Sequence, residues 1–589
     1  GSAGGGGAPF EEGRVESGTD ASVSTDASSD SDALPPVDAA DAPFDAPAEQ
    51  DSAIGDVAIE DAPEESAAEA GPDSGLDLGG GLTLFPSDPT PGQSVTLRYT
   101  GVLAAASNVH VHYGFNGWNE VQGASLSSQD DGTGNLDFFV EDAMSGSPGG
   151  VWEHTLVLPA DARALHVVLY SEQGADRTWD SNAGMDYNAG FPVVLYGPAL
   201  TWDGTVQPHD GVIVNFHTGW PCKGRVDYGT GGTLASSVTE PAPGRAHHVR
   251  LAGLSASSTW SYRVSCDALT DPAVRTFRTA GPQSSKFSFV VMGDVQEGGE
   301  ANRWKRTADR VMTAHADAAF VLLTGDMPWN DKPGAWWTFF DQGRELLGSH
   351  AIVPAKGNHD VNLGETAPGK TTMERLFALD AMSGSETHYV LRYGAAAFVV
   401  LDSQYSDGFA SGTGDQYTWA AQRIQGPPVS DATWVFASWH VPPYNAGARH
   451  WLEQGTFRDI TALFDGKVDW VFGGHEHLYQ RMRPMRFNGV QAPSASYGRG
   501  AGDGIGYVVV PPAAAWPETA LIPSTDPKSY YRDRLAYPLV PKSTDTAPSE
   551  NGYGVVSLDG NEFRLETWGV GGPGAPVNPH LIDQVSYTR

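Results

Sequence analysis

Five polar clusters in the second half of the chain contain side chains of the kinds that bind metal ions. The candidate ligands are Asp294, Gln296, Asp326, Asn358, His440, His475 and His477. Carboxylate and amide oxygens and imidazole nitrogens are suitable donors for Mn, Fe and Zn. A single cluster is unspecific, because a Gly-Asp pair or a Gly-His-x-His sequence is common in turns. Five in one chain, each after a run of strand length, are hard to produce by chance.

Each cluster directly follows an apolar run of strand length. The runs cover residues 287–292, 319–323, 352–354, 433–437 and 468–472. Helical patterns separate several of them, and this alternation predicts a layered α/β fold. Ligands in open α/β sheets gather beyond the carboxyl ends of the strands. The five clusters are therefore expected to converge.

The order and content of the clusters resemble the signature of calcineurin-like metallophosphoesterases, and more narrowly that of purple acid phosphatases. The narrower resemblance rests on Tyr479 and Arg481 after the last histidine pair. It rests also on His440, which Pro and Tyr residues follow, and on a β-rich region upstream. With that region included, the resemblance covers residues 198–589. It implies an α-β-β-α layered catalytic domain over residues 283–589.

The resemblance also implies two metal ions that share one carboxylate, that of Asp326. The first ion would be bound by Asp294, Asp326 and His477, with Gln296 as a weaker ligand. The second would be bound by Asp326, Asn358, His440 and His475. The substrate would be contacted by Asn358, His359, Tyr444 and Arg481. His359 would protonate the leaving group, and Asp360 beside it would orient the His359 ring.

The implied reaction is hydrolysis of a phosphomonoester by a metal-bound hydroxide. Two cations about 3.5–4 Å apart neutralise phosphoryl oxygens and lower the pKa of a bridging water. Hydrolysis of phosphodiesters or nucleotides at the same site is an alternative. A second alternative is a carbohydrate-binding protein in which the phosphoesterase fold has only a secondary role.

Two positions depart from the purple acid phosphatase pattern. Trp329 stands where those enzymes have an iron-binding Tyr, and an indole cannot replace it as a ligand. Gln296 stands where the wider superfamily usually has His. These changes favour a pair of Mn, Fe(II) or Zn ions over a site locked to Fe(III), without selecting one metal. Glu476, between two ligands, is expected to face solvent, and residues 511–550 are expected to form a long loop over the site.

Residues 81–197 show short alternating strand patterns and many turn residues, which predict a β-sandwich. His112, Trp118 and Trp179 lie in sequences that resemble starch-binding modules of families 25 and 53. The resemblance implies that both indoles stack on sugar rings and that His112 bonds a hydroxyl of an α-glucan. In the plainer alternative, both Trp side chains fill the core of a small sandwich.

Residues 198–282 alternate in the same way and resemble the fibronectin-III-like domain upstream of purple acid phosphatase catalytic domains. Cys222 and Cys266, the only two cysteines, both lie there. In an exported protein they are expected to pair, because disulfides persist in oxidising compartments. The predicted fold class is thus multidomain, with two all-β sandwiches before an α/β domain.

Residues 1–80 are rich in Ala, Asp, Ser, Pro and Gly, and they predict a disordered acidic tether. The formal charge of -36 argues against nucleic acid as a partner. No apolar run is long enough to span a bilayer. A Gly-rich start before a polar tether suits a secreted or cell-surface protein, such as a processed lipoprotein.

Overall fold

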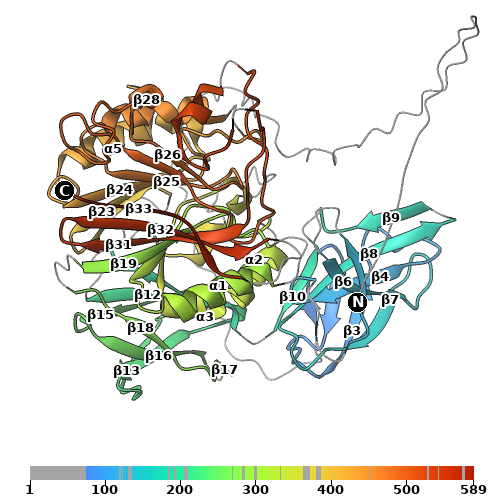
Figure 1. The fold of residues 1–589 in the computed structure, drawn as a ribbon. Helices are drawn as coiled ribbons and strands as arrows, with labels where there is room; N and C mark the ends of the chain where they lie inside the picture. The colour runs from blue at the N-terminus through green and yellow to red at the C-terminus, as the bar shows by residue number, and fades with distance from the viewer. Residues whose placement is uncertain are drawn as a thin grey trace, which may run out of the picture. The chain divides into compact units, whose positions relative to one another are not determined.

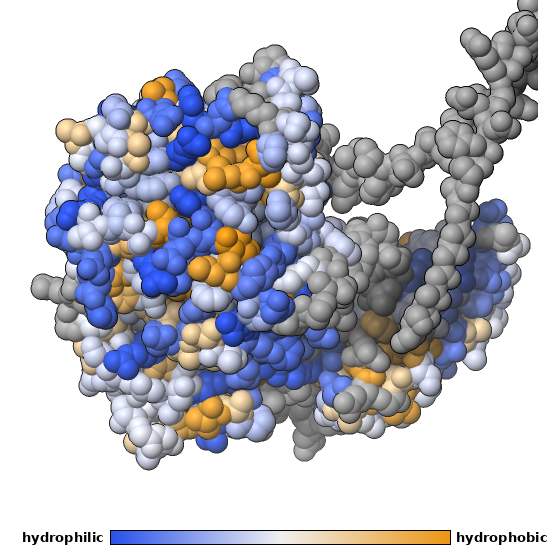
Figure 2. Space-filling view, in the orientation of Figure 1, coloured by the Kyte–Doolittle hydropathy of each residue, from blue (hydrophilic) through white to orange (hydrophobic). Residues whose placement is uncertain are grey.

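The computed structural model describes most of the chain beyond the predicted tether. The described ranges are 75–118, 121, 124–130, 136–174, 176–183, 186–191, 194–204, 210–267, 269–281, 286–297, 302–331, 333–361, 372–379, 387–450, 453–526, 529–541, 543–572 and 578–589. Of the predicted tether, residues 1–74 lie outside these ranges. Among the described helices, none is long and apolar enough to cross a membrane. The face in Figure 2 is mostly hydrophilic, with small separate hydrophobic patches.

The first β-rich region forms two sheets. Its strands are β1 (Leu76–Asp77), β2 (Leu82–Phe85), β3 (Ser94–Tyr99), β4 (His110–Phe115), β5 (Ser127–Asp130), β6 (Leu136–Ala143), β7 (Trp152–Val157), β8 (Ala164–Gln173), β9 (Asp176–Asp180) and β10 (Tyr187–Gly190). One sheet has the order β1-β2-β3-β7, and the other has the order β10-β8-β4-β6-β5 with β9 on β8. Alternate residues such as Val95, Leu97 and Val111 are buried in a shared core, because successive side chains of a strand point to opposite faces.

The second β-rich region is joined to the sheet that follows it. Its strands are β11 (Val194–Trp202), β12 (Gly211–Cys222), β13 (Gly224–Thr230), β14 (Ser236–Thr239), β15 (Gly244–Ala252), β16 (Thr259–Cys266), β17 (Leu269–Thr270) and β18 (Arg275–Arg278). β13, β14, β16, β17 and β18 make a separate antiparallel sheet. β11 pairs antiparallel with β12 but parallel with β21 (Ala351–Pro354). The sheet is thus continuous across the predicted domain boundary at residue 282.

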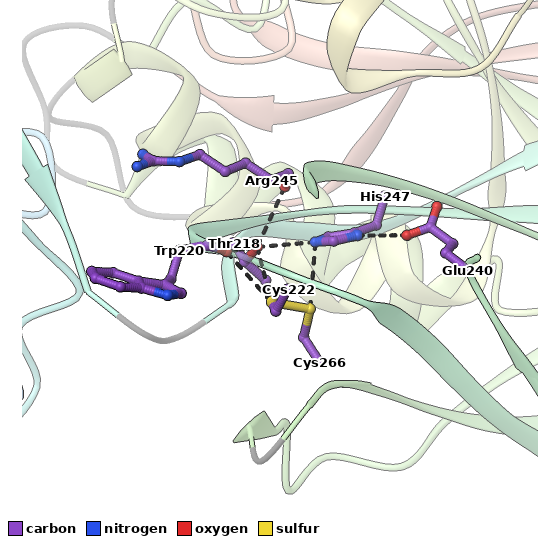
Figure 3. Close-up of a disulfide and its surroundings, with 7 residues drawn as sticks. All are labelled: Thr218, Trp220, Cys222, Glu240, Arg245, His247 and Cys266. Atoms are coloured by element: carbon purple, nitrogen blue, oxygen red, sulfur yellow. Dashed lines mark hydrogen bonds and ion pairs between the residues drawn. A yellow bond between two sulfur atoms is a disulfide. The ribbon is translucent and has the colours of Figure 1, made fainter. Parts of the chain in front are cut away.

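Cys222 and Cys266 form a disulfide, which confirms the expected pairing. The bond joins the end of β12 to the end of β16, and the sulfurs are buried. Figure 3 shows His247 between the disulfide and Glu240. The His247 Nδ1 atom lies 2.7 Å from Glu240 Oε2, and its Nε2 atom lies 2.9 Å from Thr218 Oγ1. The disulfide thus links the two sheets of this region within a hydrogen-bonded network.

Replacing both cysteines with serine is expected to lower the free energy of unfolding by about 4 kcal/mol, because the bond closes a loop of 44 residues. Urea unfolding of the double variant Cys222→Ser/Cys266→Ser checks this value. Wild type in a reducing agent should show a similar loss. Equal stability of oxidised wild type and the variant would show that the bond contributes nothing.

The last region contains the remaining strands and all of the described helices. The strands are β19 (Lys286–Met292), β20 (Phe320–Leu323), β21, β22 (Tyr389–Tyr393), β23 (Ala396–Val400), β24 (Trp434–Ser438), β25 (Trp470–Gly473), β26 (Gln480–Met482), β27 (Met485–Arg486), β28 (Val490–Gln491), β29 (Gly506–Val509), β30 (Leu535–Tyr537), β31 (Asn551–Asp559), β32 (Glu562–Gly571) and β33 (His580–Thr588). The α-helices are α1 (Arg303–Ala314), α2 (Pro333–Gln342), α3 (Arg344–Ser349), α4 (Thr372–Leu376) and α5 (Asp415–Gln425). The 3-10 helices are η1 (Asn358–Asp360), η2 (Ser406–Phe409), η3 (Glu453–Leu463), η4 (Phe487–Gly489) and η5 (Ser529–Arg534).

These strands belong mainly to two sheets. A nine-stranded sheet has the order β15-β12-β11-β21-β20-β19-β31-β32-β33, and a seven-stranded sheet has the order β22-β23-β24-β25-β29-β26-β30. Figure 1 shows β31, β32 and β33 beside β19. The central strands β19, β20 and β21 are parallel, as are β23, β24, β25 and β29. Each of the two sheets therefore presents a row of carboxyl strand ends.

The two sheets pack face to face through aromatic side chains. The Phe289 ring on β19 lies 5.1 Å from that of Phe398 on β23 and 5.3 Å from that of Phe436 on β24, in edge-to-face contacts. These strands are buried on both faces, which explains why they are apolar runs without alternation. Ala420 and Ile424 of α5 belong to a hydrophobic cluster on the other side of the seven-stranded sheet.

Candidate metal centre

The nine-stranded sheet supplies four of the predicted ligands from the ends of three adjacent strands. Asp294 and Gln296 follow β19, Asp326 follows β20, and Asn358 begins η1 after β21. Asp294 and Asp326 have left-handed backbones, with φ values of 49° and 55°. Non-glycine residues rarely adopt this conformation, and it often marks functional sites. Both carboxylates are buried at the end of the sheet.

The seven-stranded sheet supplies the three histidines. His440 follows β24, and His475 and His477 follow β25. His440 Nδ1 donates a hydrogen bond to the Thr324 carbonyl at 3.0 Å, which leaves Nε2 as the donor atom for a metal ion. The predicted convergence of residues from separate clusters is therefore present in the structure.

Donor atoms from three residues surround His440 Nε2. They are Asp326 Oδ2 at 3.1 Å, Asn358 Oδ1 at 3.1 Å and His475 Nδ1 at 3.2 Å. Ligands about 2.1 Å from one ion and at right angles to each other are separated by about 3.0 Å. The observed spacings match this value, so these residues fit a single first-row metal ion.

Asp294 and His477 form a second group of donors. His477 Nδ1 donates to the Trp516 carbonyl at 3.0 Å, and His477 Nε2 lies 3.5 Å from Asp294 Oδ1. Asp294 Oδ2 is buried and accepts no hydrogen bond from any described residue. A buried carboxylate oxygen is costly without a partner. A cation bound here would satisfy it, so the residues fit a second ion.

The electrostatics of the site favour added positive charge. Burial alone lowers the pKa of the His440 imidazole, but the carboxylates of Asp326 and Asp294 outweigh burial and raise it to about 9. Burial raises the pKa of Asp294 to about 7, although His440 opposes this rise. Without metal, His440 and Asp294 therefore tend to keep their protons. Bound metal ions would supply the positive charge in place of those protons.

The His440 pKa predicts how stability depends on pH after metal is removed with a chelator. The ordinary pKa of His is about 6.5, and its folded-state value is raised to about 9. The stabilisation from this proton is complete below about pH 6.5 and is lost as pH rises through about 9. Thermal unfolding of chelated protein should therefore show a falling Tm over this range, and the variant His440→Gln should show a smaller fall. An equal fall in the variant would exclude His440 as the cause.

The three predicted sugar-binding residues lie together in the first sandwich. The ring centroid of His112 lies 5.1 Å from that of Trp118 and 5.7 Å from that of Trp179. The Trp179 side chain is 46% exposed, which excludes it as a core residue. Trp118 is half-buried, and its Nε1 atom donates to Asp186 Oδ2 at 3.1 Å. Two residues that sequence reasoning did not identify, Phe139 and Tyr170, extend this aromatic group.

Comparison with known families finds a match in each of the two regions that carry these candidate sites. Residues 287–479 match calcineurin-like phosphoesterases, and the matched segment includes all seven candidate ligands. Residues 287–479 belong to a calcineurin-like phosphoesterase domain. Residues 95–167 match the starch/carbohydrate-binding module of family 53. These matches confirm the two resemblances that the sequence motifs indicated.

Curated relatives of the phosphoesterase domain include plant purple acid phosphatases. Purple acid phosphatase 22 of Arabidopsis thaliana is 27% identical over 253 residues, which are 42% of this chain and 55% of the relative. Fe(3+)-Zn(2+) purple acid phosphatase 12 of the same plant is 27% identical over 211 residues, which are 33% of this chain and 43% of the relative. The chain thus spans about half the length of the curated relatives it matches.

A purple acid phosphatase from yellow lupin (Lupinus luteus) seeds has a similar fold. The TM-score is 0.53 at 17% sequence identity, and the superposition covers 84% of this chain and 93% of the lupin chain. At this identity the similarity concerns the fold alone.

Gln296, which was predicted to be a weaker ligand, lies at the candidate metal centre beside Asp326. Its Nε2 atom donates to Asp326 Oδ2 at 2.5 Å. His359 is half-buried, its backbone N–H donates to Asp326 Oδ1 at 2.9 Å, and its Nδ1 atom donates to the Trp329 carbonyl. The Trp329 ring lies 5.4 Å from the His359 ring. Trp329 thus contacts the predicted proton donor with both its ring and its carbonyl.

The predicted role of Asp360 in orienting His359 is wrong. The carboxylate of Asp360 accepts backbone N–H groups of Asp326, Met327 and Gly357 at 2.7–2.9 Å. Burial and the neighbouring Asp326 carboxylate raise the pKa of Asp360 above its usual range. Asp360 instead fixes the turn that carries Asp326, and the Trp329 carbonyl orients His359.

The structure does not support the predicted substrate contacts of Tyr444 and Arg481. The Tyr444 ring is buried, and its hydroxyl lies 3.0 Å from Thr461 Oγ1. Arg481 makes a bidentate ion pair with Asp583 of β33, at 2.6 and 3.0 Å. Both side chains are therefore occupied by structural partners, which argues against a contact with phosphate.

Glu476, which was expected to face solvent, is fully buried. Its carboxylate accepts Asn445 Nδ2 at 2.7 Å and the backbone N–H of His450 at 3.0 Å. The His450 ring lies 3.9 Å from the ring of His475, so His450 is a site residue that sequence reasoning missed. Glu476 thus fixes the position of residues 445–450, which place His450 beside His475.

The segment expected to form a loop over the site, residues 511–550, contains η5 and β30. Its first part borders the metal centre, where the backbone N–H of Ala515 donates to the Asp294 carbonyl at 3.0 Å. The Trp516 carbonyl, one residue later, accepts His477 Nδ1. This part of the chain therefore supports one ligand from each sheet.

Proposed function

We propose that the chain is a metal-dependent phosphatase that hydrolyses phosphomonoesters at a dinuclear centre. The observation that supports this most strongly is the set of donor atoms 3.1–3.2 Å from His440 Nε2. The neighbouring group of Asp294 and His477 supplies donors for a second ion. When bound, two Mn, Fe or Zn ions would neutralise phosphoryl oxygens and lower the pKa of a water molecule.

The residues of the chain have separate roles in this proposal. When ions are bound, the Asp326 carboxylate, whose Oδ2 atom lies 3.1 Å from His440 Nε2, would be the ligand that both share. Asn358 and His359 contact the phosphoryl group. Because His359 Nδ1 donates to the Trp329 carbonyl, Nε2 is the ring atom that passes a proton to the leaving alkoxide.

The architecture assigned by resemblance belongs to the same proposal. We assign residues 198–282 as a fibronectin-III-like sandwich, and the two larger sheets with their helices as the α-β-β-α arrangement. The antiparallel pairings of β11–β18 and the Phe289–Phe398 contact between the larger sheets support these assignments. We place the protein at the cell surface or outside the cell, which suits its disulfide.

Hydrolysis of p-nitrophenyl phosphate and of its bis ester, measured on protein loaded with Mn or Zn, tests the proposed reaction. The monoester should be hydrolysed with the larger kcat/KM, and a chelator should abolish the activity. A larger kcat/KM for the bis ester would identify a phosphodiesterase instead. Absence of turnover with every metal tested would overturn the catalytic proposal.

We also propose that the first sandwich binds α-glucan through His112, Trp118 and Trp179. Replacing Trp179 with alanine is expected to weaken retention on insoluble starch roughly three- to tenfold, because a stacking surface is lost. The matched control is Val157→Ala, which changes another exposed apolar residue of the sandwich. Equal retention of wild type and Trp179→Ala would remove Trp179 from the binding surface.

A further inference from the structure

Trp516 lies at the edge of the metal centre. Its carbonyl accepts the hydrogen bond from His477 Nδ1 at 3.0 Å, and the residue before it donates to the Asp294 carbonyl. Glu518, two residues later, donates its backbone N–H to the His477 carbonyl at 2.8 Å. The Trp516 main chain is thus fixed on both sides, beside two candidate metal ligands, Asp294 and His477.

The Trp516 indole is held firmly, yet it remains open to solvent. The Arg303 guanidinium carbon lies 4.7 Å from the ring centroid, in a cation–π contact, and Arg303 itself is 1% exposed. The indole keeps 43% of its surface exposed. Single exposed apolar residues are common on protein surfaces and need no explanation. A large ring fixed on a buried cation at the border of a metal site is a more specific arrangement.

We propose that Trp516 forms a subsite that stacks on the sugar ring of the leaving group, so that the substrates are sugar phosphomonoesters. This inference rests on the proposed phosphatase function. The phosphoryl group would occupy the metal centre, and its ester oxygen would carry the leaving group toward the border where Trp516 lies. The C–H faces of a pyranose ring are flat and apolar, and they suit an open indole.

The first sandwich supports a sugar over other flat groups. Its exposed Trp179 and half-buried Trp118 form an aromatic surface of the same chemical kind in the same chain. In the proposed reaction, water adds to phosphorus, the bond between phosphorus and the ester oxygen breaks, and the oxygen takes a proton. The products are inorganic phosphate and a sugar hydroxyl, and no other reactant is required.

The test compares kcat/KM for glucose 6-phosphate and glycerol 3-phosphate in the metal-loaded full chain. Wild type should prefer the sugar phosphate, and Trp516→Ala should lower the ratio of the two kcat/KM values roughly three- to tenfold. Trp516→Phe keeps an aromatic face and should retain most of the preference. The matched control is Trp419→Ala, which removes a half-buried indole from α5 and should leave the ratio unchanged.

Two results would overturn the subsite and leave the phosphatase proposal intact. One is an equal fall of kcat/KM for both substrates in Trp516→Ala, which would show that the residue only positions His477. The other is a preference for adenosine 5′-phosphate over glucose 6-phosphate that Trp516→Ala abolishes, which would identify a nucleobase subsite. If wild type hydrolysed p-nitrophenyl phosphate but neither glucose 6-phosphate nor glycerol 3-phosphate, the subsite would also be overturned and the phosphatase proposal would stand. If it hydrolysed none of the three, both would fail.

Discussion

Replacing Asp326 with asparagine is expected to lower kcat/KM for p-nitrophenyl phosphate at least about a thousandfold, because both ions lose their shared anionic ligand. The Asp326 carboxylate is buried, Oδ1 accepts the His359 N–H, and Oδ2 lies 3.1 Å from His440 Nε2. An asparagine amide has nearly the same shape but carries no charge. The amount of metal retained after gel filtration should fall together with the activity.

The control for this substitution is Asp309→Asn on α1. Asp309 forms an exposed ion pair with Lys305, so the variant should keep wild-type activity and metal content. Wild-type activity of Asp326→Asn at saturating metal would contradict the assignment of Asp326 as the shared ligand.

Gly357→Ala is expected to have the second largest effect, about a hundredfold loss of kcat/KM together with roughly 1–3 kcal/mol lower stability. A Cβ atom on Gly357 would lie 2.0 Å from Asp326 Oδ1 and 2.3 Å from the Asp326 nitrogen. The turn carrying Asp326 cannot move away, because Asp360 holds its backbone. Activity assays and urea unfolding measure the two losses.

Gly455→Ala is the matched control for this substitution. A Cβ atom on Gly455 meets nothing within 4 Å, so this variant should behave as wild type. If Gly357→Ala also kept wild-type activity, the close packing of Gly357 against Asp326 would be irrelevant to the site.

The convergence of the candidate metal ligands was predictable from sequence because each of these residues is tied to a local pattern. An apolar run ending in a polar cluster defines a buried strand and its carboxyl end, and sheet geometry then brings those ends together. Asp326 and His440 are 114 positions apart, yet both lie at such ends and come within 3.1 Å. The grouping of Trp118 and Trp179 with His112 came instead from the resemblance to starch-binding modules, since both Trp residues stand in the sequence among turn residues whose positions strand periodicity does not fix.

The errors concern side chains whose partners lie far away in sequence. Arg481 was assigned to the substrate, but β33 brings Asp583 to it from 102 residues away. Asp360 and Glu476 were judged from their immediate neighbours, whereas both carboxylates accept backbone N–H groups of folded loops. No sequence pattern reports such loop geometry. The join between β11 and β21 was missed for the same reason, since strand periodicity does not identify the neighbour of a strand.

The most direct test of the central claim is a crystal structure of the metal-loaded protein with anomalous scattering data. Two anomalous peaks about 3.5–4 Å apart are expected, one bound by Asp294 and His477 and the other by Asn358, His440 and His475, with Asp326 between them. A single peak, or peaks that Asp326 does not contact, would contradict the dinuclear centre on which the proposed hydrolysis depends.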